Sequence, residues 1–137
     1  MKVAFGTDER SAMTDEVERH ITSSGHEIVF AVRDESWPRA GRSVGSAVAD
    51  GSADVGVVMC WTGTGVSIAA NKVSGVRAAL CADAQTATGA RRWNDANVVA
   101  MGMRHTTAAV AVEICDAFFG TDVDPDEQRI IRDVEAE

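Results

Sequence analysis

The sequence predicts an α/β fold in which a five-stranded parallel β-sheet carries helices on both faces. Short apolar runs alternate along the chain with stretches whose apolar residues recur at helical spacing, which indicates parallel strands joined by helices. The run 54–60 is apolar without alternation, as is typical of a strand covered on both faces. Because 137 residues have room for one domain, we expect a single domain over 1–137.

Five apolar runs are the predicted strands, and they occupy residues 2–5, 27–32, 54–60, 76–81 and 97–101. The first run ends at Gly6, and the second consists largely of residues that favour strands. Because the run 54–60 has no polar face, we expect it to lie in the centre of the sheet.

The stretches between the first three strands have helical features. Apolar residues recur at four-residue steps from Met13 to Ile21, and Ser-Ser-Gly at 23–25 ends this helix because glycine adopts the left-handed cap conformation. We expect the polar segment 33–42 to be a surface loop. A brief helical face follows around 44–48.

Helices are also predicted at 65–72, 84–92 and 106–119. A last helix is expected after Asp124 and Pro125, because Asp suits the N-cap and Pro the first helical position. Its apolar stripe has few predicted neighbours in the chain itself. We therefore expect the segment 124–137 to pack on a partner subunit.

Charge and composition argue against several classes of partner. Thirteen Lys and Arg residues against 21 Asp and Glu residues give a net charge of −8, which repels nucleic-acid backbones and anionic lipid. No apolar run approaches the roughly 20 residues of a membrane span, and the first residues turn polar too early for a signal peptide. We expect a cytoplasmic protein with no nucleic-acid or membrane partner.

The three cysteines are an odd number without CxxC spacing, so the sequence suggests neither a disulfide framework nor a zinc site. Cys81 and Cys115 lie in apolar stretches and are interpreted as core residues. Cys60 ends the predicted central strand. There it is either a small buried apolar residue or a reactive thiol beside a helix N-terminus.

Parallel sheets of this kind bind ligands beyond the carboxyl ends of their strands. This rule selects the loops 6–10, 60–65, 81–84 and 101–105. The segment 60–67, Cys-Trp-Thr-Gly-Thr-Gly-Val-Ser, joins a predicted buried strand to a helix through two glycines, and backbone N–H groups of such a turn bind an oxyanion or phosphate. It is not a Walker loop, and the GxGxxG dinucleotide motif fails at Ile68.

Six segments of the chain carry motifs that occur together in one family. They are 60–65, 66–72 with the run Ser-Ile-Ala-Ala-Asn-Lys, 75–78, 94–98, and the shorter pieces 6–8 and 102–104. Together they resemble the type B ribose-5-phosphate isomerase and galactose-6-phosphate isomerase family, over the chain up to about Gly120. The resemblance implies a Rossmann-like three-layer α/β/α sandwich and a homodimer, often paired into a tetramer, with active sites at the subunit interface. It also implies aldose–ketose isomerisation of a small sugar phosphate through an enediolate, with no metal and no cofactor.

The resemblance implies roles for individual residues. Cys60 would be the base that moves a proton between the two carbons of the enediol, and Thr62 would transfer a proton to or from the substrate oxygens. Backbone amides from Gly63 to Gly65 would stabilise the enediolate charge. The substrate-binding residues implied are Asp8, Glu9, Trp61, Gly63, Thr64, Gly65, Ser67, Trp93, Asn94, Arg104, Arg129 and Arg132.

Several of these assignments have a structural alternative. Asp8 either hydrogen-bonds substrate hydroxyls or caps its loop, and Asn94 either contacts the reacting oxygens or is a turn residue. Arg104 matches a phosphate-contacting arginine. Arg129 or Arg132 reaches the partner's site, or both lie on a solvated helix face, because the sequence does not fix their register.

Four positions depart from the family pattern. Glu9 replaces a histidine that helps to bind phosphate, and a carboxylate repels a phosphate dianion. Trp93 replaces the ring-opening histidine and cannot shuttle a proton near neutral pH. Trp61 replaces a glycine and Trp37 a tyrosine. These changes predict a narrower and more apolar site, in which His105 is a candidate to replace one lost histidine.

Three functions fit these observations. The first is an isomerase of a sugar phosphate, either ribose 5-phosphate or a shorter acyclic one that needs no ring opening. The second is a non-catalytic or heteromeric sugar-binding subunit of the same fold. The third is an isomerase of an unphosphorylated sugar, which Glu9 motivates. The presence of Cys60, Thr62, Asp8 and Asn94 favours the first.

Overall fold

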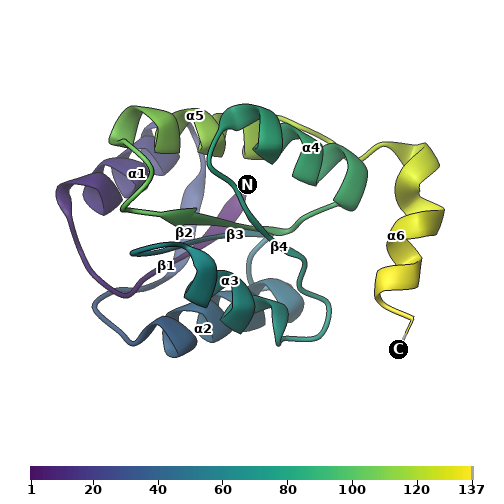
Figure 1. The fold of residues 1–137 in the computed structure, drawn as a ribbon, viewed down its shortest axis with the longest axis horizontal. Helices are drawn as coiled ribbons and strands as arrows, with labels where there is room; N and C mark the ends of the chain where they lie inside the picture. Colours follow the sequence, from purple (N-terminus) through teal and green to yellow (C-terminus); the bar gives the residue numbers. More distant parts are fainter. Residues whose placement is uncertain (137) are drawn as a thin grey trace.

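The structure, a computed structural model, describes residues 1–136, which form one sheet covered by helices (Figure 1). The strands are β1 (Lys2–Thr7), β2 (Glu27–Val32), β3 (Val55–Cys60), β4 (Ala78–Leu80) and β5 (Val98–Gly102). All neighbouring strands pair in parallel, in the order β2-β1-β3-β5-β4. The predicted five-stranded parallel sheet is confirmed, and β3 lies at its centre as expected.

The helices are α1 (Ala12–Ser23), α2 (Trp37–Ala49), α3 (Thr64–Asn71), α4 (Ala84–Asn94), α5 (Ala108–Phe119) and α6 (Gln128–Val134), with a 3₁₀ turn at Pro125–Glu127. In Figure 1, α1, α4 and α5 cover one face of the sheet, and α2 and α3 cover the other. Each face has its own core. The first contains Phe5, Ile21, Met59, Ile114 and Phe118, and the second contains Ala4, Val44, Val58, Val66 and Val98. The predicted three-layer sandwich is confirmed.

The prediction of a surface loop over 33–42 is wrong, because α2 begins within that segment at Trp37. Proline in the first turn is compatible with a helix, since the N–H that proline lacks has no partner inside the helix there. Small residues then let α2 lie close to α3. A β-carbon at Gly41 would stand 2.6 Å from the carbonyl oxygen of Val66.

The fourth strand is shorter than the predicted run 76–81 and comprises only Ala78–Leu80. The backbone N–H of Arg77 donates to the Asn97 side chain at 2.8 Å, so this part of the chain is held by a side chain before the strand begins. Edge strands are often short.

The chain reverses its direction of travel across the sheet between β1 and β3. It passes from β1 outward to β2 and then returns to β3 on the other side of β1. Loops that leave such a switch point in opposite directions open a crevice at the carboxyl ends of the strands. In the pairing register, Thr7 lies opposite Met59 and Cys60 opposite Gly102, so the loops after β1, β3 and β5 begin side by side.

The predicted C-terminal helix is confirmed, and α6 lies beyond the β4 edge of the sheet (Figure 1). Ion pairs fasten its end to the domain. Arg77 pairs with Glu135 at 2.6 Å and with Asp95 at 3.2 Å, and Asp95 also pairs with Arg91 at 3.0 Å. Among the helices of residues 1–136, none combines the length and the apolar character needed to cross a bilayer.

Candidate active site

Three strand ends meet where the sequence predicted a site. Asp8 follows β1, Cys60 ends β3 and Gly102 ends β5. Backbone hydrogen bonds extend the strand pairing into the loops: Asp8 N–H donates to Met59 at 3.3 Å, and Met103 N–H donates to Cys60 at 2.9 Å. The loops after β1 and β5 therefore have fixed positions on either side of the Cys60 segment.

Glycine is required at one position in the turn 61–65 and at one position in the neighbouring strand β5. Gly63 adopts a left-handed conformation with φ of +76°, and a β-carbon there would lie 2.6 Å from Leu80 Cδ1 and 2.8 Å from the Met101 carbonyl carbon. At the end of β5, a β-carbon at Gly102 would lie 2.6 Å from the Thr62 carbonyl oxygen. Any side chain at position 102 would therefore clash with the Thr62 backbone.

Helix α3 starts directly after this turn, and its first turn has no side-chain cap. The first backbone N–H groups of any helix lack partners within the helix, and the helix dipole places partial positive charge at the same end. The N–H groups of Thr64 and Gly65 lie in this first turn, as the predicted oxyanion cradle requires.

Cys60 is 5% exposed and packs on the α2–α3 side of the sheet, in the core that contains Val58, Val66 and Ala100. All three cysteines are free. Burial raises the pKa of the Cys81 thiol to about 11 and that of the Cys115 thiol to about 12. Those two thiols stay protonated near neutral pH, in agreement with their interpretation as core residues.

The threonines of the turn are exposed and lie next to each other. The Thr62 and Thr64 hydroxyl oxygens are 2.7 Å apart, so one of them donates a hydrogen bond to the other. The Ser67 backbone N–H closes the first helical turn on the Gly63 carbonyl at 3.2 Å. A pair of hydroxyls beside unpaired N–H groups can receive and pass on a proton at an oxygen atom.

The Asp8 carboxylate is partly buried. Its Oδ1 atom is inaccessible to solvent and has no hydrogen-bond partner among the described residues. Burial, and then the negative charge of the neighbouring Glu9, raise the pKa of Asp8 above its usual range. Glu9 itself is exposed, and its backbone is held by the Thr7 hydroxyl, which donates to the Glu9 carbonyl at 2.7 Å. A buried acceptor without a partner is available for a ligand hydroxyl.

Arg104 and His105 follow β5 and are both exposed. The Arg104 backbone N–H donates to the Trp61 carbonyl at 2.8 Å, and the Arg104 guanidinium carbon lies 5.9 Å from the centre of the Trp61 ring. The His105 N–H donates to the Gly102 carbonyl at 3.3 Å, which folds this loop into a turn.

Trp37 lies against the same turn from the α2 side. A β-carbon at Gly65 would stand 2.8 Å from Cδ2 of the Trp37 indole, so the ring covers the start of α3. The sequence indicated a remodelled site from the positions of the tryptophans, but the contacts of Trp37 with Gly65 and of Leu80 with Gly63 were not predicted. Both arise from packing between helices and strands that only the fold brings together.

Trp93, Asn94, Arg129 and Arg132 do not join Cys60 within one chain. Helix α4 carries the chain back to the amino ends of the strands, and Trp93 and Asn94 lie at its end, where they line cavities with Ala79 of the edge strand β4. The two arginines are exposed on α6. Their predicted roles stay predictions that require a second subunit.

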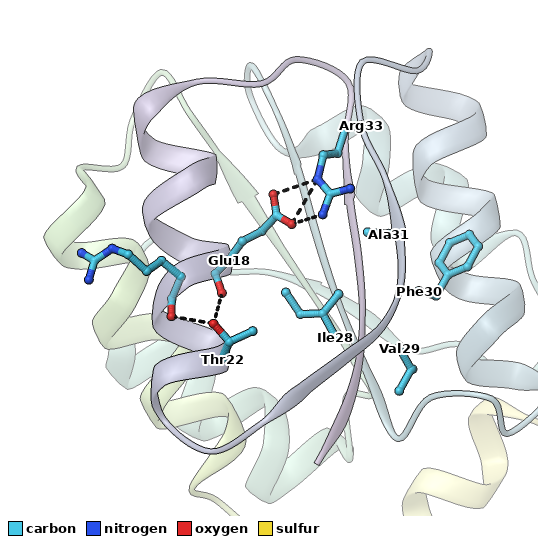
Figure 2. Close-up of a pocket in the computed structure, with 8 residues that line it drawn as sticks. Glu18, Thr22, Ile28, Val29, Phe30, Ala31 and Arg33 are labelled. Carbon is cyan, nitrogen blue, oxygen red and sulfur yellow. Dashed lines mark hydrogen bonds and ion pairs between the residues drawn. The ribbon is translucent and has the colours of Figure 1, made fainter.

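Three cavities of the single chain lie away from Cys60. One of about 330 Å³ lies between β4 and α6, and another of about 550 Å³ lies between β4 and α4. A third, a groove of about 410 Å³, lies between α1 and the edge strand β2. Figure 2 shows Arg33 paired with Glu18 across its upper end. Within residues 1–136, no group of three or more His, Cys, Asp or Glu side chains is arranged to hold a metal ion.

Known proteins are similar to this chain over nearly all of its length. The profile of the family described as Ribose/Galactose Isomerase matches residues 3–136. The ribose-5-phosphate isomerase B of Escherichia coli K12 is 36% identical over 124 residues, which are 87% of this chain and 83% of that protein.

Two further comparisons extend this result. The D-erythrulose-4-phosphate isomerase of Pectobacterium atrosepticum is 32% identical over 124 residues, covering 86% of this chain and 82% of that protein. The structure of the type B ribose 5-phosphate isomerase of Trypanosoma brucei superposes with a TM-score of 0.90 at 38% identity, over 98% of this chain and 97% of that one.

Proposed function

The chain belongs to the ribose/galactose isomerase family and is a sugar-phosphate isomerase that interconverts an aldose and a ketose, and we propose that it does so through an enediolate formed at Cys60. The observation that carries the proposal is the register of β1, β3 and β5, which places Cys60 beside the glycine turn and Asp8. The amides of the turn and the Asp8 carboxylate then belong to the segments that adjoin Cys60.

The proposed reaction needs three groups. The Cys60 thiolate removes the proton from the carbon next to the carbonyl and returns it to the neighbouring carbon, so the base is regenerated. Negative charge on the former carbonyl oxygen is stabilised by the N–H groups of Thr64 and Gly65, an effect that is typically worth about 3 kcal/mol for one such donor. Thr62 passes the proton between the two oxygens.

The proposed substrate is a short acyclic sugar phosphate. Two observations support this choice: Trp93 cannot transfer the proton that opens a furanose ring, and one relative is a D-erythrulose-4-phosphate isomerase. A four-carbon sugar that carries phosphate on its last oxygen has no hydroxyl left to form a five-membered ring. Ribose 5-phosphate is the alternative, and an unphosphorylated sugar is the second alternative because Glu9 stands exposed beside Asp8.

The proposed assembly is a homodimer or a tetramer built from such dimers. Exposed apolar side chains gather around the β4 edge: Leu80, Trp93 (56% exposed), Ile130 and Val134 (70% exposed). Two-fold pairing of this surface, the β4-edge cluster, would cover it and would bring Trp93 and Asn94 toward the Cys60 loop of the other subunit. The three free thiols support a reducing compartment, and we place the protein in the cytoplasm.

Proton exchange with solvent tests this function. The protein is incubated in D₂O with three- to six-carbon aldose and ketose phosphates and with their unphosphorylated forms, and NMR follows deuterium at the carbon next to the carbonyl. Exchange with a four-carbon phosphate, lost in Cys60→Ala and retained in the matched variant Cys115→Ala, is the expected result. No exchange with any sugar by folded protein would contradict the enzyme and favour a sugar-binding subunit.

Inorganic phosphate separates the two substrate classes. It should compete with a phosphorylated substrate, and the competition should weaken as salt screens the attraction. Exchange with an unphosphorylated sugar that phosphate leaves unchanged would overturn the phosphorylated substrate while keeping the proton transfer.

A further inference from the structure

Among residues 1–136, the guanidinium of Arg104 has no acidic partner. The ion pairs formed by residues 1–136 include Arg33, Arg77 and Arg91, each of which faces a carboxylate, and none includes Arg104. The Arg104 guanidinium instead lies over the Trp61 ring, whose centre is 5.9 Å from the guanidinium carbon. No carboxylate of residues 1–136 therefore compensates the charge of this arginine, whose backbone is bonded to the residue after Cys60.

An aromatic partner differs from a carboxylate in what it leaves free. A carboxylate accepts the N–H donors of a guanidinium and so occupies them. An aromatic ring attracts the cation through its π face and accepts none of those bonds. A guanidinium held in this way has its fork of donors open, and that fork matches the oxygens of a phosphate group.

Backbone hydrogen bonds fix where the Arg104 side chain begins. Trp61 follows Cys60 directly, and its carbonyl accepts the Arg104 N–H at 2.8 Å, one step beyond the bond from Met103 to Cys60. The indole is 55% exposed, so it stands at the surface of the loop and is not part of the core. Two backbone hydrogen bonds thus hold the segment 103–104 against the segment 60–61, and the Arg104 side chain extends from this held stretch.

We propose that Trp61 is a positioning residue that holds the Arg104 guanidinium at the phosphate end of the site through the face of its indole ring. The proposal rests on the proposed function, because it takes a phosphorylated substrate. It also gives a reason for an indole at a loop position. Without the ring, the long Arg104 side chain would lose its rotamer freedom when phosphate binds, and this loss would weaken binding. With the ring, the side chain is ordered before binding.

The test measures phosphate binding and the Arg104 side chain directly, without the reaction. Inorganic phosphate is titrated at constant ionic strength into wild type, Trp61→Phe, Trp61→Leu, Trp61→Gly and Arg104→Gln, and NMR follows the Arg104 Nε–H and the amides of Gly63 and Gly65. Arg19→Gln, which removes an exposed arginine from α1 far from the loop, is the matched charge control.

The expected results form a series. Trp61→Leu and Trp61→Gly should weaken phosphate binding about two- to fivefold, the range that an exposed cation–π contact supports. They should also remove the ring-current shift of the Arg104 Nε–H. Trp61→Phe, which keeps an aromatic face, should restore most of both, and Arg104→Gln should weaken binding further. Arg19→Gln should match wild type.

Other outcomes overturn the proposal. The proposal fails if wild type and Trp61→Gly have the same phosphate affinity and the same Arg104 Nε–H chemical shift. It also fails if Arg104→Gln binds phosphate as wild type does, or if wild type does not bind phosphate. Loss of binding in Trp61→Gly by a protein that exchanges no sugar proton would sustain this inference and contradict the isomerase. An active enzyme whose phosphate affinity is unchanged by Trp61→Gly would sustain the isomerase and contradict this inference.

Discussion

Gly102 and Thr62 face each other with almost no space between their backbones, since a β-carbon on Gly102 would lie 2.6 Å from both the carbonyl carbon and the carbonyl oxygen of Thr62. One residue ends β5 and the other lies two residues beyond Cys60 in the turn that leads to α3. The shape of the proposed oxyanion cradle therefore depends on the absence of one methyl group from the neighbouring strand.

Gly102→Ala should deform the turn. The methyl group has no flexible neighbour to displace, so we expect a loss of about 1–3 kcal/mol of unfolding free energy and a loss of activity well beyond tenfold. Urea unfolding and the deuterium exchange assay measure the two effects.

The control for this variant is Gly51→Ala. Gly51 has φ of +80° with nothing within 4 Å of an added β-carbon, so that change strains the backbone far from the site without a clash. It should cost stability of about 1 kcal/mol and leave the specific activity unchanged. Equal activity losses in both variants would mean that the close approach of Gly102 has no part in the reaction.

Asp8→Asn should stabilise the fold at neutral pH. The pKa of Asp8 is raised in the folded chain by burial and by Glu9, so the protonated carboxyl is favoured by folding, and that stability is lost as the pH rises through the folded pKa. Asn cannot ionise, so the variant does not carry the cost of desolvating a charged carboxylate as the pH rises. Thermal unfolding should show a higher Tm for the variant, with a difference that vanishes below about pH 4.

Asp83→Asn should change stability with pH in the opposite direction. The Asp83 carboxylate accepts the Thr86 N–H at 2.7 Å at the start of α4, and these hydrogen bonds lower its pKa. The variant should lose stability at neutral pH, where wild type gains from the ionised cap, and the loss should shrink on acidification. A Tm of Asp8→Asn at or below that of wild type at pH 7 would contradict the conclusion that the ionised Asp8 carboxylate destabilises the folded chain.

Much of this arrangement could be predicted from local sequence. The alternation of apolar runs and helical spacing predicted five strands in parallel, and the unbroken apolar run 54–60 correctly predicted the central strand. The two glycines of the turn indicated a backbone cradle because a left-handed residue, here Gly63, and a bare helix start are both local properties.

The remainder depended on contacts between distant segments. The polar composition of 33–42 concealed the start of α2, whose stability comes from packing on α3 through Gly41 and Gly45. The partner of Arg104 could not be inferred, since nothing in the sequence pairs it with Trp61. Nor does the sequence show that α4 carries Asn94 away from the Cys60 of its own chain.

The three thiols should differ in reactivity toward iodoacetamide at pH 8. Cys81 and Cys115 have pKa values raised by burial to about 11 and about 12, so their thiolate fractions are small and their side chains are enclosed. Cys60 lies at a strand end beside the glycine turn, and we expect it to be alkylated first, with protection by inorganic phosphate. Peptide mass mapping of native protein measures the order, and earlier labelling of either core thiol would contradict it.

Complementation between two inactive variants tests whether the site is shared between subunits. In a two-fold dimer whose sites each combine Cys60 of one subunit with Asn94 of the other, a mixed dimer of Cys60→Ala and Asn94→Ala has one intact site and one that carries both changes. Random exchange makes half of the dimers mixed, so an equal mixture of two dead variants should recover about a quarter of wild-type activity.

The geometry of the chain makes this outcome specific. Trp93, a member of the β4-edge cluster, and Asn94 lie at the end of α4, and within one subunit they line cavities with β4 and not with the loop after β3. Adding Ile130→Glu to both parents should abolish the recovery, because a charge in the cluster opposes burial of that surface. If Asn94 acted within its own subunit, the mixed dimer would contain one site lacking Cys60 and one lacking Asn94, and the mixture would show only the summed residual activities of its parents.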